Sequence, residues 1–190
     1  SPNGTEWEQR SISFETTVVS KLTWNGTQLI ALNQRSGLFY ISQDAVQWDF
    51  HASDSSGHYT VTLVYSGYQY VRIQMGRLSR SIDGNEWTQI SMIENGREIV
   101  TFSDVIWTGT QFVATAHNKI ATSSDGITWT YSYNGNITFS NKIFWDGDQY
   151  FLLRHETYHQ YSVMTSPDLS TWTRRNVPSG FSYITDFYWN

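Results

Sequence analysis

Two short motifs alternate along this chain at nearly constant spacing, and this repetition constrains the fold more than any other feature. The first motif reads Ser-x-Asp-Gly-x-x-Trp, with drift, and its clearest copies are residues 81–87 and 123–129. Weaker copies occupy 42–48 and 166–172, and a fifth opens the chain at 1–7. Its tryptophans, 39 to 43 residues apart, are Trp7, Trp48, Trp87, Trp129 and Trp172. A period of about 40 residues is typical of propeller and solenoid repeats.

The second motif reads aromatic-x-Gly-x-Gln-hydrophobe and falls between copies of the first. It occurs at 24–29, 65–70, 107–112 and 145–150, and a fifth copy begins at Trp189. Asp-Gly and Asn-Gly turns between apolar runs favour tight hairpins, because Gly and Asn accept positive φ. Each unit therefore reads as four short antiparallel strands, A to D. The sequence predicts an all-β protein, a β-propeller of about five four-stranded antiparallel blades in a single domain, 1–190.

Strand boundaries follow most clearly from the third complete unit. We expect strand A to end over Val105–Trp107 and strand B to cover Gln111–Ala114. Strand C is expected over Lys119–Thr122, and strand D from Trp129 onward. Outside strands, the variable segments are the B–C hairpins and the D–A connections.

The chain contains five A-type and five D-type strands but only four B–C hairpins. Ile184–Trp189 reads as a fifth strand A, and Trp7–Ile12 reads as a fifth strand D. The fifth blade is thus expected to be incomplete and shared by the two chain termini. Three explanations stay open: a piece of a longer propeller, a ring with one reduced blade, or a ring completed by another chain. Unpaired strand edges would favour association with a partner or with a second copy.

The Ser-x-Asp-Gly-x-x-Trp hairpin resembles the Asp-box, or BNR, repeat of sialidase-like and sortilin-like propellers. This chain departs from that repeat by one residue fewer between Asp and Trp, and by losing the Gly in two copies. The resemblance implies that Ser and Asp bond turn backbone groups and that Trp packs between blades. It implies a structural role and no activity. The residues concerned are Asp44, Asp83, Asp125, Asp168, Trp48, Trp87, Trp129 and Trp172.

Composition excludes several partner classes. The net charge is −5 with no basic run, so a nucleic-acid partner is not expected. No stretch approaches the roughly 20 apolar residues of a membrane span, so membrane insertion is not expected. Cysteine is absent, which removes disulfides, thiolate metal sites and a cysteine nucleophile. An extracellular or cell-surface location is favoured over a cytoplasmic one.

Two patterns suggest catalysis, and both have simpler explanations. His155-Glu156-Thr157-Tyr158-His159 matches the His-Glu-x-x-His pattern of zinc proteases, but that chemistry needs a helix, and this segment aligns with a B–C hairpin. The repeated aspartates are expected on different blades, whereas glycosidase carboxylates lie within about 10 Å of each other. We therefore expect no enzyme, no metal site and no cofactor, with a remnant glycosidase-like enzyme as the weakest alternative.

Ligand binding is expected on the face that carries the variable B–C hairpins and D–A connections. The expected function is a non-catalytic scaffold for protein–protein interaction or assembly. The alternative is a lectin-like module, because aromatic and amide-rich loops suit glycans. The predicted ligand-binding residues are Gln34, Arg35, Gln74, His117, Asn118, His155, Glu156, Tyr158 and His159.

Overall fold

A computed structural model describes residues 5, 19, 21–24, 27–33, 38–51, 60–98, 102–133, 140–157 and 160–175. These residues form four separate four-stranded antiparallel sheets, each a simple meander in chain order. We call the sheets blades 1 to 4. Among the described residues, no helix has the length and apolarity that a membrane span requires.

Each blade begins with the strand that carries the second motif's aromatic residue. Blade 1 contains β1 (Lys21–Trp24), β2 (Leu29–Leu32), β3 (Phe39–Ser42) and β4 (Asp49–His51). Blade 2 contains β5 (Thr60–Tyr65), β6 (Tyr70–Gln74), β7 (Arg77–Ser81) and β8 (Thr88–Ile90). Blade 3 contains β11 (Phe102–Trp107), β12 (Phe112–Ala116), β13 (Lys119–Ser123) and β14 (Thr130–Tyr133). Blade 4 contains β15 (Ser140–Trp145), β16 (Tyr150–Thr157), β17 (Gln160–Ser166) and β18 (Thr173–Arg175).

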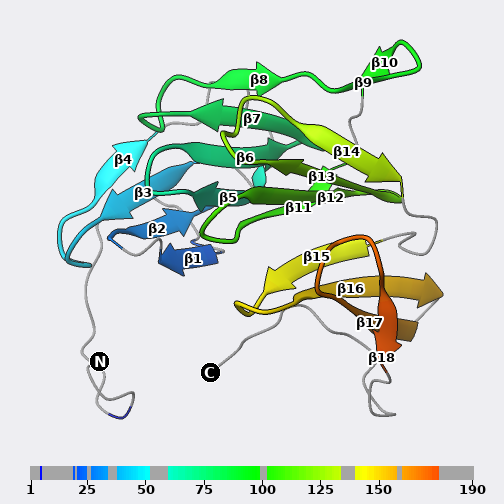
Figure 1. Ribbon diagram of the computed structural model, residues 1–190. Coiled ribbons are helices and arrows are strands. Elements are labelled where there is room, and N and C mark those ends of the chain that lie inside the picture. Colours follow the sequence, from blue (N-terminus) through cyan, green and yellow to red (C-terminus); the bar gives the residue numbers. More distant parts are fainter. Residues whose placement is uncertain are drawn as a thin grey trace.

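The blades are arranged as a propeller, which confirms the predicted fold class. Figure 1 shows blades 1 and 4 at the two ends of an arc, with blades 2 and 3 between them. The inner strand β11 contacts both β5 and β15, so the A strands lie nearest the axis. Four complete blades are described. The expected fifth blade, from Trp7–Ile12 and Ile184–Trp189, lies outside the described residues.

A cross-strand aromatic pair lies at the start of blades 2, 3 and 4, whereas Trp24 of blade 1 pairs with Leu29. Trp107 pairs with Phe112 across the β11–β12 ladder, and their ring centroids are 4.6 Å apart. Trp145 and Tyr150 repeat this contact in blade 4 at 4.3 Å. Aromatic pairs opposite each other in an antiparallel ladder stabilise the hairpin. The turn between them contains a glycine at positive φ, such as Gly109 at 97°.

The hydrophobic core consists of layers between successive blades. One layer joins Val71, Ile73 and Leu78 of blade 2 to Val105 and Phe112 of blade 3. Blades 1 and 2, and blades 3 and 4, are joined by equivalent layers. Each blade thus has a leading face, which packs on the next blade, and a trailing face, which packs on the preceding one.

Several boundaries differ from the predictions. β11 begins at Phe102, and a register shift follows before Asp104, so the inner strand is longer than Val105–Trp107. The connection after blade 2 contains a small hairpin of β9 (Ile93–Glu94) and β10 (Arg97–Glu98). Tryptophan side chains pack in the interblade layers, as Trp129 does, and strand D begins one residue later.

Candidate functional site

The C–D turns form a nearly identical structure in all four blades. In blade 3, the Asp125 Oδ1 atom accepts the Ile127 and Thr128 N–H groups, both at 2.8 Å, and the Ser123 hydroxyl at 3.0 Å. Asp168 does the same with Ser170 and Thr171 in blade 4, at 2.9 Å each. The turns at Asp44 and Asp83 follow this pattern. These carboxylates therefore order the turn backbone.

The backbone donors also change the acidity of these groups. Hydrogen bonds from the N–H groups of Thr171 and Ser170 lower the pKa of Asp168 to about 2. The pKa values of Asp44, Asp83 and Asp125 are lowered by equivalent N–H donors. Hydrogen bonding to the charged form favours ionisation. The turn face therefore carries a set of carboxylates that are ionised at neutral pH.

The glutamine of the second motif connects neighbouring blades. Gln111 Nε2 donates to the Tyr150 hydroxyl of blade 4 at 3.1 Å. The Tyr70 hydroxyl donates to Gln28 Oε1 of blade 1 at 3.4 Å. Phe112 has no hydroxyl at the corresponding place, and Gln69 donates instead to the backbone carbonyl of Asp125. The repeated glutamine therefore bonds the next blade in all three described interfaces.

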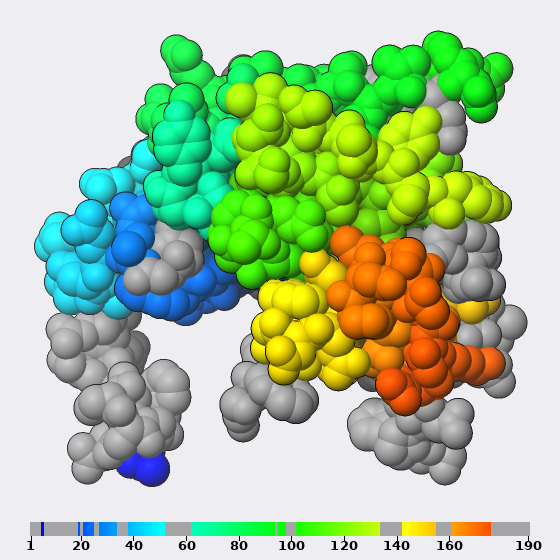
Figure 2. Space-filling model, in the orientation of Figure 1, coloured from blue at the N-terminus to red at the C-terminus, as the bar shows by residue number. Residues whose placement is uncertain are grey.

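A groove of about 320 Å³ lies between blades 3 and 4 on the turn side. Figure 2 shows the region where the orange atoms of blade 4 meet the yellow-green atoms of blade 3. Its lining combines hydroxyl groups, an amide, a carboxylate and two apolar side chains. The lining residues are Gln111, Ile120, Thr122, Thr130, Tyr131, Ser132, Asp168, Leu169 and Ser170. The Tyr131 side chain points to the other face of β14, with Ala121 and toward blade 2, because it alternates with Thr130 and Ser132. Such a surface can hydrogen-bond a polyhydroxylated ligand and contact its apolar face through Ile120 and Leu169.

The corresponding places between the other blades are filled by side chains. Between blades 1 and 2, His51 Nδ1 lies 3.1 Å from Asn85 Oδ1, and its ring stacks on Phe39. Between blades 2 and 3, the Gln69 amide occupies the space beside Gly126. The groove is therefore a property of one interface and is not repeated at the other two described.

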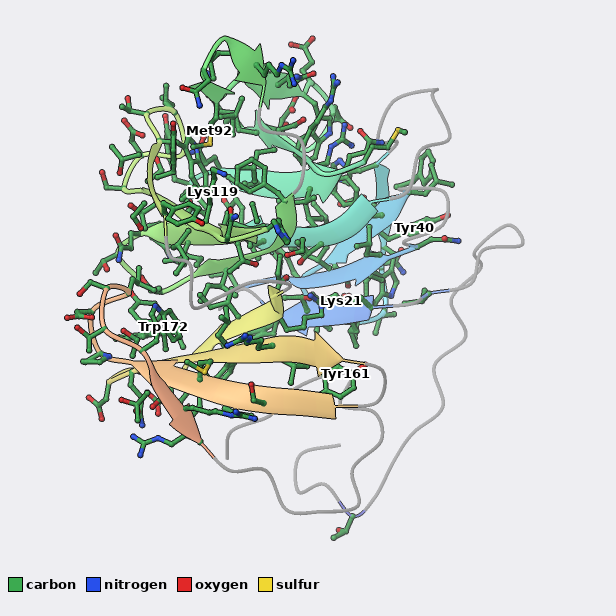
Figure 3. All side chains as sticks on the ribbon, turned by 90° about the vertical axis from the view of Figure 1, so that its right-hand side faces the viewer. Lys21, Tyr40, Met92, Lys119, Tyr161 and Trp172 are labelled. Carbon is green, nitrogen blue, oxygen red and sulfur yellow. The ribbon has the colours of Figure 1, made fainter. Side chains whose placement is uncertain are left out.

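A second polar group lies at the axis. Lys21, Thr62, Asp104 and Lys142 each stand three residues before the inner-strand aromatic, in equivalent registers. Lys21 Nζ donates to Thr62 Oγ1 at 3.2 Å, and the Ile143 N–H donates to Asp104 Oδ2 at 3.0 Å. Asp104 is only 4% exposed. Burial raises its pKa, while the charges of Lys142 and Lys21 act in the opposite direction. Figure 3 shows Lys21 near the centre of the view.

The described members of the predicted ligand-binding set lie on the B–C hairpins of three different blades. Gln74 ends β6, next to a turn at Met75–Gly76, while His117 and Asn118 form the hairpin turn of blade 3. His155 and Glu156 belong to β16 in blade 4. Gln34, Arg35, Tyr158 and His159 lie outside the described residues. The three described hairpins belong to different blades, so their ligand-binding role stays a prediction.

The zinc-protease pattern is not placed on a helix. His155, Glu156 and Thr157 form the end of a β-strand. Within the part of the chain described, no group of three His, Cys, Asp or Glu side chains could hold a metal ion.

Sequence reasoning missed both the groove and the axial group. The axial residues could have been found by aligning the inner strands on their aromatic residue. The groove could not, since its residues come from two different repeats and no motif marks Thr122, Tyr131 or Ser170.

Comparison with known proteins finds no matching family model and no matching curated protein. Solved structures do match. Streptogramin B lyase has 8% identity and a TM-score of 0.66 over 91% of this chain and 59% of that one. A nidogen/laminin complex structure matches at 14% identity and a TM-score of 0.64, over 83% of this chain and 64% of that one. The extracellular domain of BT4673 from B. thetaiotaomicron matches at 12% identity and a TM-score of 0.60, over 90% of this chain and 24% of that one.

These similarities define the chain as a β-propeller, at identities that show the fold alone. The chain spans less than two thirds of the lyase. The prediction that this chain is not an enzyme is wrong, because its propeller architecture does not support that conclusion. Structures of streptogramin and virginiamycin B lyases, which are enzymes, share the propeller arrangement, so the fold leaves room for catalysis.

Proposed function

We propose that this chain is a recognition propeller that binds a carbohydrate in the groove between blades 3 and 4. The observation that carries the proposal is the composition of the groove wall. Four hydroxyl-bearing residues, Thr122, Thr130, Ser132 and Ser170, line it together with the ionised carboxylate of Asp168. A volume of about 320 Å³ is at the lower end of the range of about 300–1,000 Å³ for small-molecule sites.

The wall offers both kinds of contact that sugars use. The Thr122 and Thr130 hydroxyls lie 3.3 Å apart across the β13–β14 ladder and can each exchange this bond for one to a ligand hydroxyl. Asp168 stays ionised far below neutral pH and provides a strong acceptor. The side chains of Ile120 and Leu169 supply the apolar contact. An extracellular or cell-surface location, where glycans are abundant, fits this function.

The proposal is tested by a glycan array probed with the purified protein and two matched variants. Thr130→Val removes a hydroxyl group from the groove wall. Thr88→Val removes the hydroxyl group at the equivalent first position of strand D in blade 2, which does not line the groove. We expect binding to a narrow glycan class that falls at least tenfold in Thr130→Val and persists in Thr88→Val. A silent array with folded protein, or equal loss in both variants, contradicts the proposal.

A second candidate function is protein recognition at the outer part of blade 1. Val46 in the C–D turn and Phe50 on β4 expose 47% and 54% of their surface. Exposed apolar residues gathered on one blade favour a protein partner. If the glycan array is silent, loss of co-purifying partners in Phe50→Ser, compared with Tyr68→Ser on blade 2, supports this function.

A further inference from the structure

The groove between blades 3 and 4 is lined by a single charged side chain. Its lining residues include no Lys, Arg or His, and Asp168 is the one carboxylate among them. The Asp168 Oδ1 atom accepts hydrogen bonds from the Ser166 hydroxyl at 3.1 Å and from two backbone N–H groups of its own turn. These bonds hold the carboxylate in place and keep the pKa of Asp168 at about 2. The groove therefore has a fixed negative charge at neutral pH.

The surroundings of the groove carry the same sign of charge. The turns that join strands A to B and strands C to D share one edge of each sheet, because alternate turns of a meander emerge together. The residues between these strands include no Lys, Arg or His in any of the four blades. Their acidic residues are Asp44, Asp83, Glu86, Asp125, Asp146, Asp148 and Asp168. The local potential is therefore negative and favours a cationic ligand over an anionic one.

The cations that follow the groove in the chain lie on β18. Arg175 Nε donates to Thr165 Oγ1 of its own blade at 3.0 Å. Arg174 lies on the trailing face of blade 4 with Met164, but it does not line the groove. An anionic ligand would therefore find no cationic side chain among the lining residues, and the Asp168 carboxylate would repel it.

We propose that the groove selects glycans whose sugar carries a free amino group, and that the Asp168 carboxylate accepts a hydrogen bond from the protonated amine. This inference rests on the carbohydrate-binding function proposed above and adds the class of sugar. An ammonium group and a carboxylate form a charge-assisted hydrogen bond, which is stronger than a neutral one. The hydroxyl-bearing residues of the wall remain for the sugar hydroxyls. N-acetylation removes the charge, and a carboxylate or sulfate on the sugar is repelled, so attraction and repulsion both contribute to specificity.

Isothermal titration calorimetry with a matched pair of ligands tests the selectivity. The probes are a glucosamine oligomer and the same oligomer fully N-acetylated, titrated at about pH 6, where both a free amine and Asp168 are charged. We expect the glucosamine oligomer to bind about fivefold more tightly, which is the upper range for an exposed ion pair. The preference should nearly disappear in about 1 M NaCl, where the screening length is about 3 Å. A preference that persists at this salt concentration would overturn the proposal.

Matched variants locate the charge that is responsible. Asp168→Asn keeps an oxygen that can accept the N–H groups of the turn but removes the charge. Asp83→Asn makes the same change in the equivalent turn of blade 2, away from the groove. The preference for the glucosamine oligomer should be lost in Asp168→Asn and kept in Asp83→Asn and in Arg174→Gln. Equal loss in both aspartate variants would assign the effect to the net charge of the turn face and overturn the proposal.

The selectivity and the carbohydrate-binding function fail in different ways. If the folded protein binds neither oligomer and no glycan on the array, both are overturned. If it binds the N-acetylated oligomer or an acidic glycan at least as tightly as the glucosamine oligomer, and Thr130→Val weakens that binding, the function stands and the selectivity is overturned. A preference for acidic glycans that disappears in Arg174→Gln would assign charge recognition to Arg174 and would also overturn the selectivity.

Discussion

The C–D turns of blades 2 and 3 have glycine where those of blades 1 and 4 have Ala45 and Leu169. All four residues nevertheless adopt left-handed backbone, with φ of 61° at Ala45, 81° at Gly84, 64° at Gly126 and 65° at Leu169. Because non-glycine residues adopt this conformation at a cost of about 1 kcal/mol, the hydrogen bonds of the turn dominate the local preference. The backbone therefore does not explain why glycine is present in two blades only.

Space explains the difference. A Cβ at Gly126 would lie 2.1 Å from the Gln69 amide nitrogen, because Gln69 bends toward the Asp125 carbonyl. In blade 4 the corresponding glutamine, Gln111, bonds the Tyr150 hydroxyl, and Leu169 packs into the layer between blades 3 and 4. A Cβ at Gly84 would lie 3.0 Å from Phe39 Cζ and 3.3 Å from His51 Nδ1 of blade 1. In both glycine-containing turns, side chains of the preceding blade thus occupy the space that a Cβ would need.

The largest effect is expected for Gly126→Ala. The added methyl group collides with Gln69 and the left-handed backbone becomes strained, so we expect a loss of about 2–4 kcal/mol. Urea denaturation measures it. Combining the change with Gln69→Ala should recover part of the loss, because the collision is removed. Unchanged loss in the double variant would show that backbone strain alone is responsible.

A smaller loss is expected for Leu169→Gly. The change relieves the backbone but removes a side chain that packs against Val113 and Ile120, and we expect a net loss of about 1–2 kcal/mol. Leu169→Ala, which keeps the strain and loses the packing, should be less stable than or equal to Leu169→Gly. If glycine stabilises the protein, packing at this turn contributes little.

The opposite sign is expected for Ala45→Gly. Here no large side chain is lost, and relief of the left-handed strain exceeds the entropy cost of glycine by up to about 0.5 kcal/mol. A rise in the thermal midpoint checks this prediction, with Ala121→Gly in a β-strand as a control that must destabilise. A drop for Ala45→Gly would mean that the Ala45 methyl group makes a stabilising contact.

The smallest effect per residue concerns acid, and it should not distinguish the two kinds of turn. The folded pKa of Asp168, about 2, is below its ordinary value of 3.8, so its contribution is present above pH 3.8 and is lost as the pH falls toward 2. Asp44, Asp83 and Asp125 act in the same direction. Stability measured by urea denaturation between pH 5 and pH 2 should fall less steeply in Asp168→Asn. If stability fell equally steeply with pH in Asp168→Asn and in the unchanged protein, the low pKa assigned to Asp168 would be contradicted.

The local sequence was sufficient to predict the blades and insufficient to predict the contacts between them. The Asp-Gly turns and the aromatic pair at Trp107 and Phe112 involve residues a few positions apart, so a repeated motif reveals them. The partner of Gln69 is 56 positions away, and its identity depends on whether residue 112 carries a hydroxyl. The groove is lined by residues of two repeats, among them Gln111, whose partner Tyr150 is 39 positions away, so no single repeat encodes it.

The boundaries of the inner strands show the same limit. Val105–Trp107 was predictable from its apolar character, whereas Phe102–Asp104 joins β11 because the neighbouring blade supplies support. Phe102 N–H donates to the Gly76 carbonyl of blade 2 at 3.0 Å. The absence of a catalytic motif also led to the wrong prediction about catalysis, since a propeller can assemble an active site from residues that are distant in sequence.

The interblade glutamines make each blade specific for its neighbour, so the order of the blades along the chain matters. Gln28 meets a tyrosine hydroxyl, Gln69 meets a backbone carbonyl beside a glycine, and Gln111 meets a tyrosine hydroxyl beside a leucine. If blades 3 and 4 were exchanged, Leu169 would follow Gln69 and occupy the space that its amide needs. Although the repeats look interchangeable in sequence, each one fits a particular neighbour, and this discourages mispaired or domain-swapped assemblies.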